Sequence, residues 1–413
     1  MLFAARLREW MPLSDLSLDA MEAVVRHLAP SDVNCLVRTC KALHVAAAPR
    51  LDDWSWLREQ LETDGGWETA CGAAADAGRL QALRWAIALG CPSDEQVCQL
   101  AAAGGHLEAL QLLRAQTPPC PWDVETCNEA ARGGFLEVLQ WARYEVPPCP
   151  WSEETCLSAA LFGHLEVLRW ARTQKPACPW DEGTCQAAAE GGHLELLKWA
   201  RAQTPACPWG VRTCSAAARD GHLELLKWAR AQTPPCEWGV KTCLCAALSG
   251  HLEVLQWARA QVPPCAWDEQ TCEAAAAEGH LEVLKWARAQ TPPCPWGVET
   301  CDQAAQNGYL EVLRWARAQG CEWGMSTCVA AAKGGHLDVL RFLRSQSPPC
   351  PWSKRWCFIE AGLPHNHDHE DASPFVELKA WIHTQDEDLL FDGEGSTDGE
   401  SDGEFDGESE AAE

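Results

Sequence analysis

The sequence predicts an all-α solenoid in which short helix–turn–helix repeats stack on one another. A cysteine returns every 29 residues from Cys91 to Cys294, and steps of 27 and 29 residues then lead to Cys321 and Cys350. Each repeat holds two stretches with apolar residues at helical spacing, and a glycine ends the first stretch. A fixed period of this size is typical of arrays in which neighbouring repeats bury each other's apolar faces.

The first helix of each repeat is predicted from its cap residues and its small apolar face. In the repeat over residues 149–177, Ser152 stands where other repeats have Asp, Ser or Gly, which are favoured at helix N-termini. Cys156 and Ala159 follow at helical spacing, and Gly163 suits the left-handed residue that ends a helix. We therefore expect a short helix between the cap and the glycine.

The second helix of the same repeat is expected over residues 164–174. Its apolar stripe consists of Leu165, Leu168, Trp170 and Ala171, and Pro176 stops the helix. We expect the repeated tryptophan to be a buried core residue, because neither helix can bury its stripe without a neighbour.

The pattern Ala-Ala-x-x-Gly-His, followed by an apolar helix, is similar to the ankyrin repeat. Cys156 and Trp170 fall where that family usually has Leu. Ankyrin repeats have about 33 residues, and the shortening here falls where the family places a β-hairpin, so we expect a reduced finger or a plain loop. The resemblance covers residues 64–385 and implies about eleven repeats of 27–29 residues, the last one a degenerate cap.

Comparison of the repeats separates constant positions from variable ones. Counted back from the glycine that ends the first helix, positions −7, −4 and −3 are nearly constant, whereas positions −9, −6 and −2 vary and share the opposite helix face. The ankyrin resemblance implies partner binding through this concave face, and two leucine pairs favour an interface over neutral drift. The predicted partner-binding residues, which we expect to be exposed, are Asn128, Arg132, Leu157, Leu161, Gln186, Arg219, Leu244 and Leu248.

Residues 11–45 form a separate segment that is similar to an F-box. The spacing that carries the resemblance is that of Leu16, Asp19, Val24, Val25, Leu28, Asp32, Cys40 and Lys41. It implies that Leu16, Val25 and Leu28 bind the Skp-type adaptor of a cullin–RING (SCF-type) ubiquitin ligase. The whole plan resembles the F-box/ankyrin proteins of large DNA viruses and some protists. Ser17 departs from the family's Pro, and the alternative is an N-terminal cap on a plain binding scaffold.

Two further segments flank the predicted array. Residues 46–63 are expected to form a linker helix. Residues 386–413 hold thirteen Asp or Glu and no Lys or Arg, a composition that predicts a disordered acidic tail.

Composition limits the possible partners and locations. A net charge of −26 argues against nucleic-acid binding, since phosphate contacts need a basic face. No apolar run is long enough for a transmembrane helix, so no membrane partner is expected. Because the N-terminus also makes a poor signal peptide, we expect an intracellular protein, cytoplasmic or nuclear.

The cysteines and histidines are interpreted as structural. Twenty-one of the 24 cysteines occupy the two repeat positions, and we interpret them as small core residues, with zinc or disulfides as the alternative. The histidine after the glycine is replaced by Phe135 and Tyr309 in two repeats, which a metal or catalytic role would not tolerate. We expect a non-enzymatic protein without a cofactor.

Overall fold

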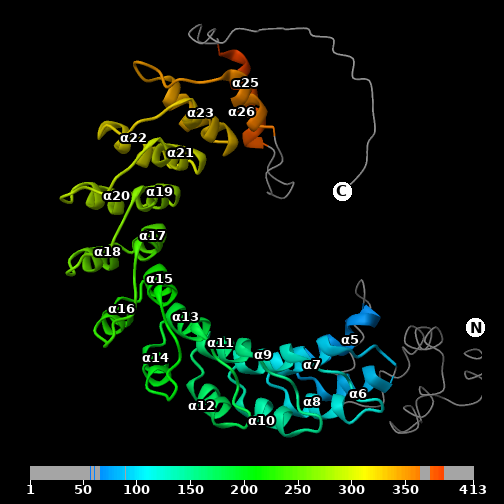
Figure 1. Cartoon of the computed structure of the whole chain (residues 1–413). Coiled ribbons are helices and arrows are strands. Elements are labelled where there is room, and N and C mark those ends of the chain that lie inside the picture. The colour runs from blue at the N-terminus through cyan, green and yellow to red at the C-terminus, as the bar shows by residue number, and fades with distance from the viewer. Residues whose placement is uncertain (1–55, 57–59, 61–65, 89, 363–372, 386–413) are drawn as a thin grey trace, which may run out of the picture. The chain divides into compact units, whose positions relative to one another are not determined.

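A computed structural model describes residues 56, 60, 66–88, 90–362 and 373–385 (Figure 1). The F-box-like segment, the acidic tail and nearly all of the linker segment lie outside these residues. The predicted adaptor contacts of Leu16, Val25 and Leu28 therefore stay predictions, as do the segment boundaries.

The described residues form 22 helices and no strand, arranged as eleven helix pairs. The predictions of an all-α solenoid and of eleven repeats are confirmed, and plain loops stand where an ankyrin hairpin would lie. The chain divides into two compact parts, Met1–Trp267 and Asp268–Glu413, here called the N-terminal and C-terminal blocks.

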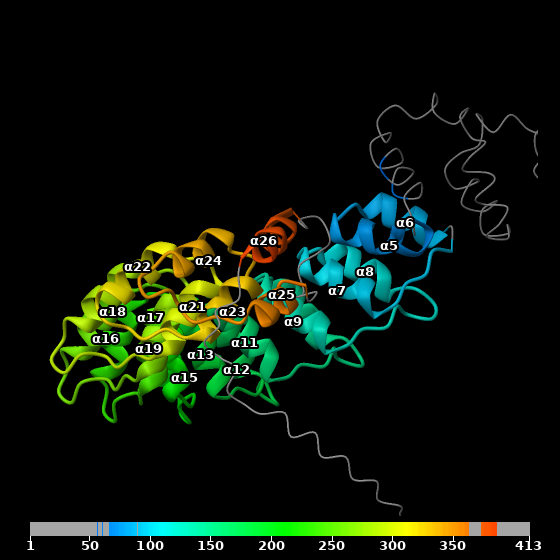
Figure 2. The ribbon, with the colours of Figure 1, turned by 90° about the horizontal axis from the view of Figure 1, so that it is seen from above.

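The described residues of the N-terminal block form seven helix pairs. Figure 2 shows the ribbon of these repeats from above. The first helices of its repeats are α5 (Gly66–Asp76), α7 (Glu95–Ala103), α9 (Val124–Arg132), α11 (Glu153–Leu161), α13 (Glu182–Glu190), α15 (Val211–Arg219) and α17 (Val240–Leu248). The second helices are α6 (Leu80–Ala88), α8 (Leu107–Arg114), α10 (Leu136–Tyr144), α12 (Leu165–Thr173), α14 (Leu194–Arg201), α16 (Leu223–Arg230) and α18 (Leu252–Arg259).

The C-terminal block repeats this plan with four helix pairs. Its first helices are α19 (Glu269–Ala277), α21 (Val298–Gln306), α23 (Met325–Lys333) and α25 (Lys354–Glu360). Its second helices are α20 (Leu281–Arg288), α22 (Leu310–Ala318), α24 (Leu337–Arg344) and α26 (Ser373–Thr384).

Within each block the first helices form one layer and the second helices another. Each first helix packs against the first helix of the next repeat and against the second helix of its own repeat. The constant Cys and Ala make this possible, because small side chains let neighbouring backbones approach. Cys156, Ala159 and Ala160 of α11, for example, are each at most 1% exposed.

The second helices bury only part of the predicted stripe, together with one residue that was not predicted. In α12, Val167, Leu168 and Ala171 are buried, whereas Leu165 and Trp170 are only half-buried. The prediction that the repeated tryptophan is a fully buried core residue is therefore wrong. Its ring lies at the edge of the layer, against a second tryptophan described below.

The turn between the two helices requires glycine. Gly163 has φ of +79°, in the left-handed region, and a Cβ atom there would lie 2.5 Å from Cε1 of His193 in the next repeat. The glycine thus serves both the reversal of the chain and the close approach of the neighbouring repeat.

The eleventh repeat closes the C-terminal block, as the sequence predicts. Helix α26 takes the second-helix place, and Phe375 lies against Gly335 as the repeated histidine does elsewhere. Among the described residues, eight cis X-Pro bonds lie in loops between repeats, among them Lys175–Pro176 and Ser347–Pro348, the latter directly before the eleventh repeat.

Candidate protein-binding surface

The repeated histidine joins each repeat to the one before it. Nε2 of His164 lies 2.9 Å from the carbonyl oxygen of Arg132, and Nε2 of His193 lies 3.0 Å from that of Leu161. In each case the partner carbonyl belongs to the end of the preceding first helix. This geometry explains the constant histidine as a structural residue, in agreement with its interpretation.

A second contact between neighbouring repeats, here called a joint like the histidine contact, was not predicted from the sequence. The constant arginine near the end of the second helix lies over the tryptophan that opens the next repeat, as Arg172 does over Trp180 at 4.0 Å from the ring centroid. Nη1 of Arg172 also donates a hydrogen bond to the carbonyl of Cys178, at 2.5 Å. The signal was present as an arginine near the end of the second helix in nine successive repeats, from Arg114 to Arg344, since a charged residue that recurs so regularly needs a fixed partner.

Tryptophan pairs extend this joint into the repeat. Trp180 meets Trp199 edge-on at 6.0 Å, and Trp209 meets Trp228 in the same way at 5.8 Å. The chain of contacts therefore runs from the arginine of one repeat through two indole rings of the next. Such cation–π and aromatic contacts are directional, so they fix the register of neighbouring repeats.

The repeated cysteines are buried core residues, as interpreted. Cys149 donates from its Sγ to the carbonyl of Asp123, at 3.2 Å, and is itself fully buried. The adjacent thiol of Cys149 and burial raise the pKa of Cys127 far above its ordinary value. A thiol held in its protonated form is a poor nucleophile. Among the described residues, no group of three or more His, Cys, Asp or Glu side chains is arranged to hold a metal ion.

The structure corrects the expected exposure of Asn128. Its side chain is only 4% exposed, and its Oδ1 accepts a hydrogen bond of 2.7 Å from Oγ1 of Thr155 in the next repeat. In the C-terminal block, Asp302 accepts from Thr327 in the same way, at 2.5 Å. A polar residue at position −6 therefore serves the joint between repeats. The constant threonine at position −8 of the following helix was the overlooked signal.

The other predicted residues lie at the solvent edge of the first helices. Arg132 is exposed, and the remaining six are half-buried. We call these seven side chains, together with Phe162, Glu190 and Asp220, the first-helix surface. Its members are Arg132, Leu157, Leu161, Phe162, Gln186, Glu190, Arg219, Asp220, Leu244 and Leu248.

One apolar part of the first-helix surface lies at α11. Leu157 and Leu161 are half-buried, and Phe162 next to them is 46% exposed. The guanidinium of Arg132 lies 5.5 Å from the centroid of the Phe162 ring and also pairs with Glu129 at 3.1 Å. Phe162 was missed because it occupies a position that is glycine, alanine or polar in the other repeats.

A second apolar part lies at α17. Leu244 and Leu248 are half-buried there, and Cys245 lies between them in the sequence. Cys245 is the least buried cysteine of the described residues, and partial burial raises the pKa of its thiol even though Arg219 and Lys241 are near. Position −5, which is alanine in several other repeats, thus adds a small apolar side chain between the two leucines.

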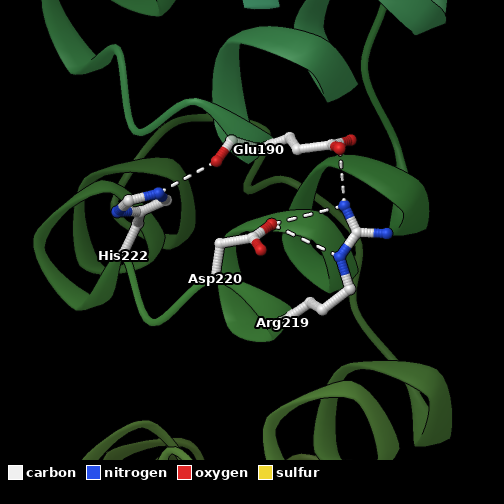
Figure 3. Close-up of polar contacts among 4 residues, drawn as sticks. All are labelled: Glu190, Arg219, Asp220 and His222. Atoms are coloured by element: carbon white, nitrogen blue, oxygen red, sulfur yellow. Dashed lines mark hydrogen bonds and ion pairs between the residues drawn. The ribbon is translucent and has the colours of Figure 1, made fainter. Parts of the chain in front are cut away.

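A charged cluster lies on α13 and α15, between the two helices that carry the apolar parts. Figure 3 shows the polar contacts within this cluster. Nη2 of Arg219 pairs with Glu190 of the preceding repeat at 2.8 Å and with Asp220 at 3.3 Å. Nε2 of His222 lies 2.9 Å from the carbonyl oxygen of Glu190. Partial burial alone would lower the pKa of Arg219, but the carboxylates of Asp220 and Glu190 outweigh it and raise the pKa. Arg219 is thus a fixed cation held between two carboxylates.

In the C-terminal block, the first helices carry acidic side chains, Glu273 and Asp302, whose pKa values are raised. Burial first, and then the nearby carboxylates of Glu299, Glu269 and Asp268, raise the pKa of Glu273. Burial likewise raises the pKa of Asp302, although its hydrogen bonds from Thr327 and Ser326 oppose the shift. The residues of the first helices therefore differ in chemistry from repeat to repeat while their backbone does not.

Comparisons with known proteins identify fold resemblances only. No family model matches the chain, and no curated protein sequence matches it. Among solved structures, the ankyrin repeat domain of human ASB11 aligns with 48% of this chain and 96% of its own at 14% identity, with a TM-score of 0.29. The maize pentatricopeptide repeat protein PPR10 aligns with 87% of this chain and 62% of its own at 14% identity, with a TM-score of 0.33. PPR10 is also known in complex with an 18-nt psaJ RNA element.

The described helices were also compared with the dimensions of a lipid bilayer. None of them combines the length and the apolar character that crossing a membrane would require.

Proposed function

We propose that this protein is a non-catalytic binding module that holds a protein target on the first-helix surface. One observation carries the proposal. The constant residues of each repeat are used in the joints, whereas the varying residues at the solvent edge place two apolar parts on either side of the Arg219 cluster. Partly exposed apolar side chains around fixed charges are the usual composition of a protein contact surface.

The net charge favours a protein over a nucleic acid as the target. The chain carries a net charge of −26, and the charged cluster between the apolar parts contains two carboxylates for its one arginine. Phosphate binding depends on the release of counterions by clustered Lys and Arg. A polypeptide with apolar anchors suits this surface better.

Affinity purification of the full-length protein tests the surface. We expect Phe162→Ser and Arg219→Glu to lose most of the target that the wild type recovers, because each removes an anchor or inverts the central charge. Val146→Ser is the matched control, since Val146 is 91% exposed in a loop away from the first helices. Equal recovery by all four proteins would exclude the first-helix surface as the binding site.

We further propose that the bound target is delivered to a ubiquitin ligase. The F-box-like segment would bind the Skp-type adaptor of a cullin–RING ligase through Leu16, Val25 and Leu28, and the repeats would act as the substrate receptor. The support is the spacing of the F-box-like residues in the sequence. The second candidate is a scaffold whose N-terminus is only a cap, as stacked arrays require at their ends.

A double substitution separates these two functions. We expect Leu16→Asp with Leu28→Asp to abolish recovery of the adaptor and cullin while target binding and thermal melting of the repeats stay unchanged. If the wild type recovers no adaptor and the double variant melts several degrees lower, the segment is a cap and the ligase proposal fails. The target-binding proposal would survive that result.

A further inference from the structure

The last first helix, α25, carries an apolar face that the described residues leave uncovered. Trp356 is 54% exposed and Ile359 is 38% exposed, and their spacing of three residues places them on one side of the helix. The corresponding residues of α23 are Thr327 and Ala330, at 0% and 9% exposure. The exposed pair is therefore a departure of the terminal repeat from the interior pattern.

The end of the described chain is fixed beside this helix. Nζ of Lys354 donates to the carbonyl of His383 at 3.2 Å and to that of Gln385 at 2.6 Å. The described chain therefore ends, at Gln385, beside the first turn of α25. At 100° per residue, Arg355 follows Lys354 around the helix, and Ile359 and Trp356 come next.

The sequence that follows Gln385 matches this order of side chains. It reads Asp386-Glu387-Asp388 and then Leu389-Leu390-Phe391, three carboxylates followed by three apolar residues. Six extended residues span about 20 Å, and a helix with its side chains is about 10–12 Å wide. The segment is thus long enough to bring its carboxylates to Arg355 and its apolar residues to Ile359 and Trp356.

We propose that residues 386–391 cross α25 and cover the apolar face of Trp356 and Ile359. The carboxylates pair with Arg355 near the start of the crossing, and Leu389, Leu390 and Phe391 exclude water from the exposed pair. The first part of the acidic tail then acts as the cap of the array, in place of a further repeat.

Hydroxyl-radical footprinting of the full-length protein tests this contact through the oxidation rate of Trp356. We expect Leu389→Ser, Leu390→Ser and Phe391→Ser together to raise that rate about tenfold, because a contact of a few apolar side chains keeps the covered state about ten times as populated as the open one. Met325, which is 49% exposed on α23, is the internal reference. Phe405→Ser is the matched control, because Phe405 begins a second Phe-Asp-Gly-Glu sequence that lacks the leucine pair.

Two further experiments, charge reversal and dilution, test whether residues 386–391 of the same chain cover Trp356. Arg355→Glu should also speed the oxidation of Trp356, whereas Arg341→Glu on the exposed side of α24 should not. An equal Trp356 rate in the wild type and the triple variant would overturn the proposal. So would protection that disappears on dilution together with a dimer in sedimentation, because a second copy would then be the occupant. Circular dichroism melting confirms that each variant is folded.

Discussion

The buried face and the two edges of one second helix, α14, are stabilised in different ways. On the buried face Leu196, Leu197 and Ala200 are at most 2% exposed and pack against the first-helix layer. At the two edges of this face Trp199 and Arg201 are half-buried and are held by directed contacts with neighbouring aromatic rings and a backbone carbonyl. The buried face depends on filled volume, and the edges depend on geometry. The following substitutions separate these two kinds of stabilisation.

Leu197→Ala should have the largest effect. Truncation of a fully buried leucine leaves a cavity, and such changes reduce the free energy of unfolding by about 2–5 kcal/mol. Leu194→Ala, at a half-buried position of the same helix, is the matched control and should cost less. Guanidinium titration of both variants measures the difference, and a loss below about 1 kcal/mol at Leu197 would show that the face is loosely packed.

Trp199→Ala should reduce the free energy of unfolding by about 2 kcal/mol. This is below the loss of about 3–5 kcal/mol for truncation of a fully buried tryptophan. The side chain is half-buried, so only part of its apolar area returns to water. A double-mutant cycle with Trp180→Ala should give a coupling of about 0.5–1.5 kcal/mol for the edge-on pair. A coupling near zero would mean that the two rings contribute area but no specific contact.

Arg201→Lys should reduce the free energy of unfolding by about 1 kcal/mol. Lysine keeps the positive charge but lacks the planar guanidinium that stacks on a ring and donates in a fixed geometry. The guanidinium lies 4.2 Å from the ring centroid of Trp209 and donates to the carbonyl of Cys207 at 2.5 Å. Arg212→Lys, at an exposed position, is the control and should leave thermal stability unchanged. Equal melting temperatures of the two variants would show that Arg201 does not stabilise the contact between repeats.

Lys198→Ala should have the smallest effect, a reduction of the free energy of unfolding by less than about 0.5 kcal/mol. Its Nζ lies 2.6 Å from Oε1 of Glu195, but the two side chains are 39% and 78% exposed, so water and salt screen the pair. Thermal melting at low and high salt checks this expectation. A larger loss that persists at high salt would assign Lys198 a packing role.

The repeat architecture could be predicted from the sequence because one period recurs with little variation. Local patterns predicted the N-caps, the left-handed Gly163 and the terminal repeat around α26. The depth of burial at Trp170 was not, because helical spacing identifies an apolar stripe without showing which side of it meets the neighbouring layer. Val167 lies in the core although it was not part of the predicted stripe, whereas Leu165, which was, is only half-buried.

The candidate surface was predictable only in part. Variation between repeats pointed to the solvent edge at Leu161 and Arg219, which are half-buried and not exposed as expected. It could not separate this edge from the contact between repeats at Asn128. That distinction depends on a hydrogen bond to Thr155, 27 residues away. Phe162 was overlooked for the opposite reason, because it departs from the pattern in a single repeat.

The hydrogen bond from each histidine to the preceding helix end has an evolutionary consequence. His164 and His193 bond to a backbone carbonyl, so the contact does not depend on which side chain the preceding repeat carries. A gene that duplicates or deletes one 29-residue segment would therefore still encode joints that fit. Such a gene could gain or lose binding positions one repeat at a time, without a period of selection for a new core.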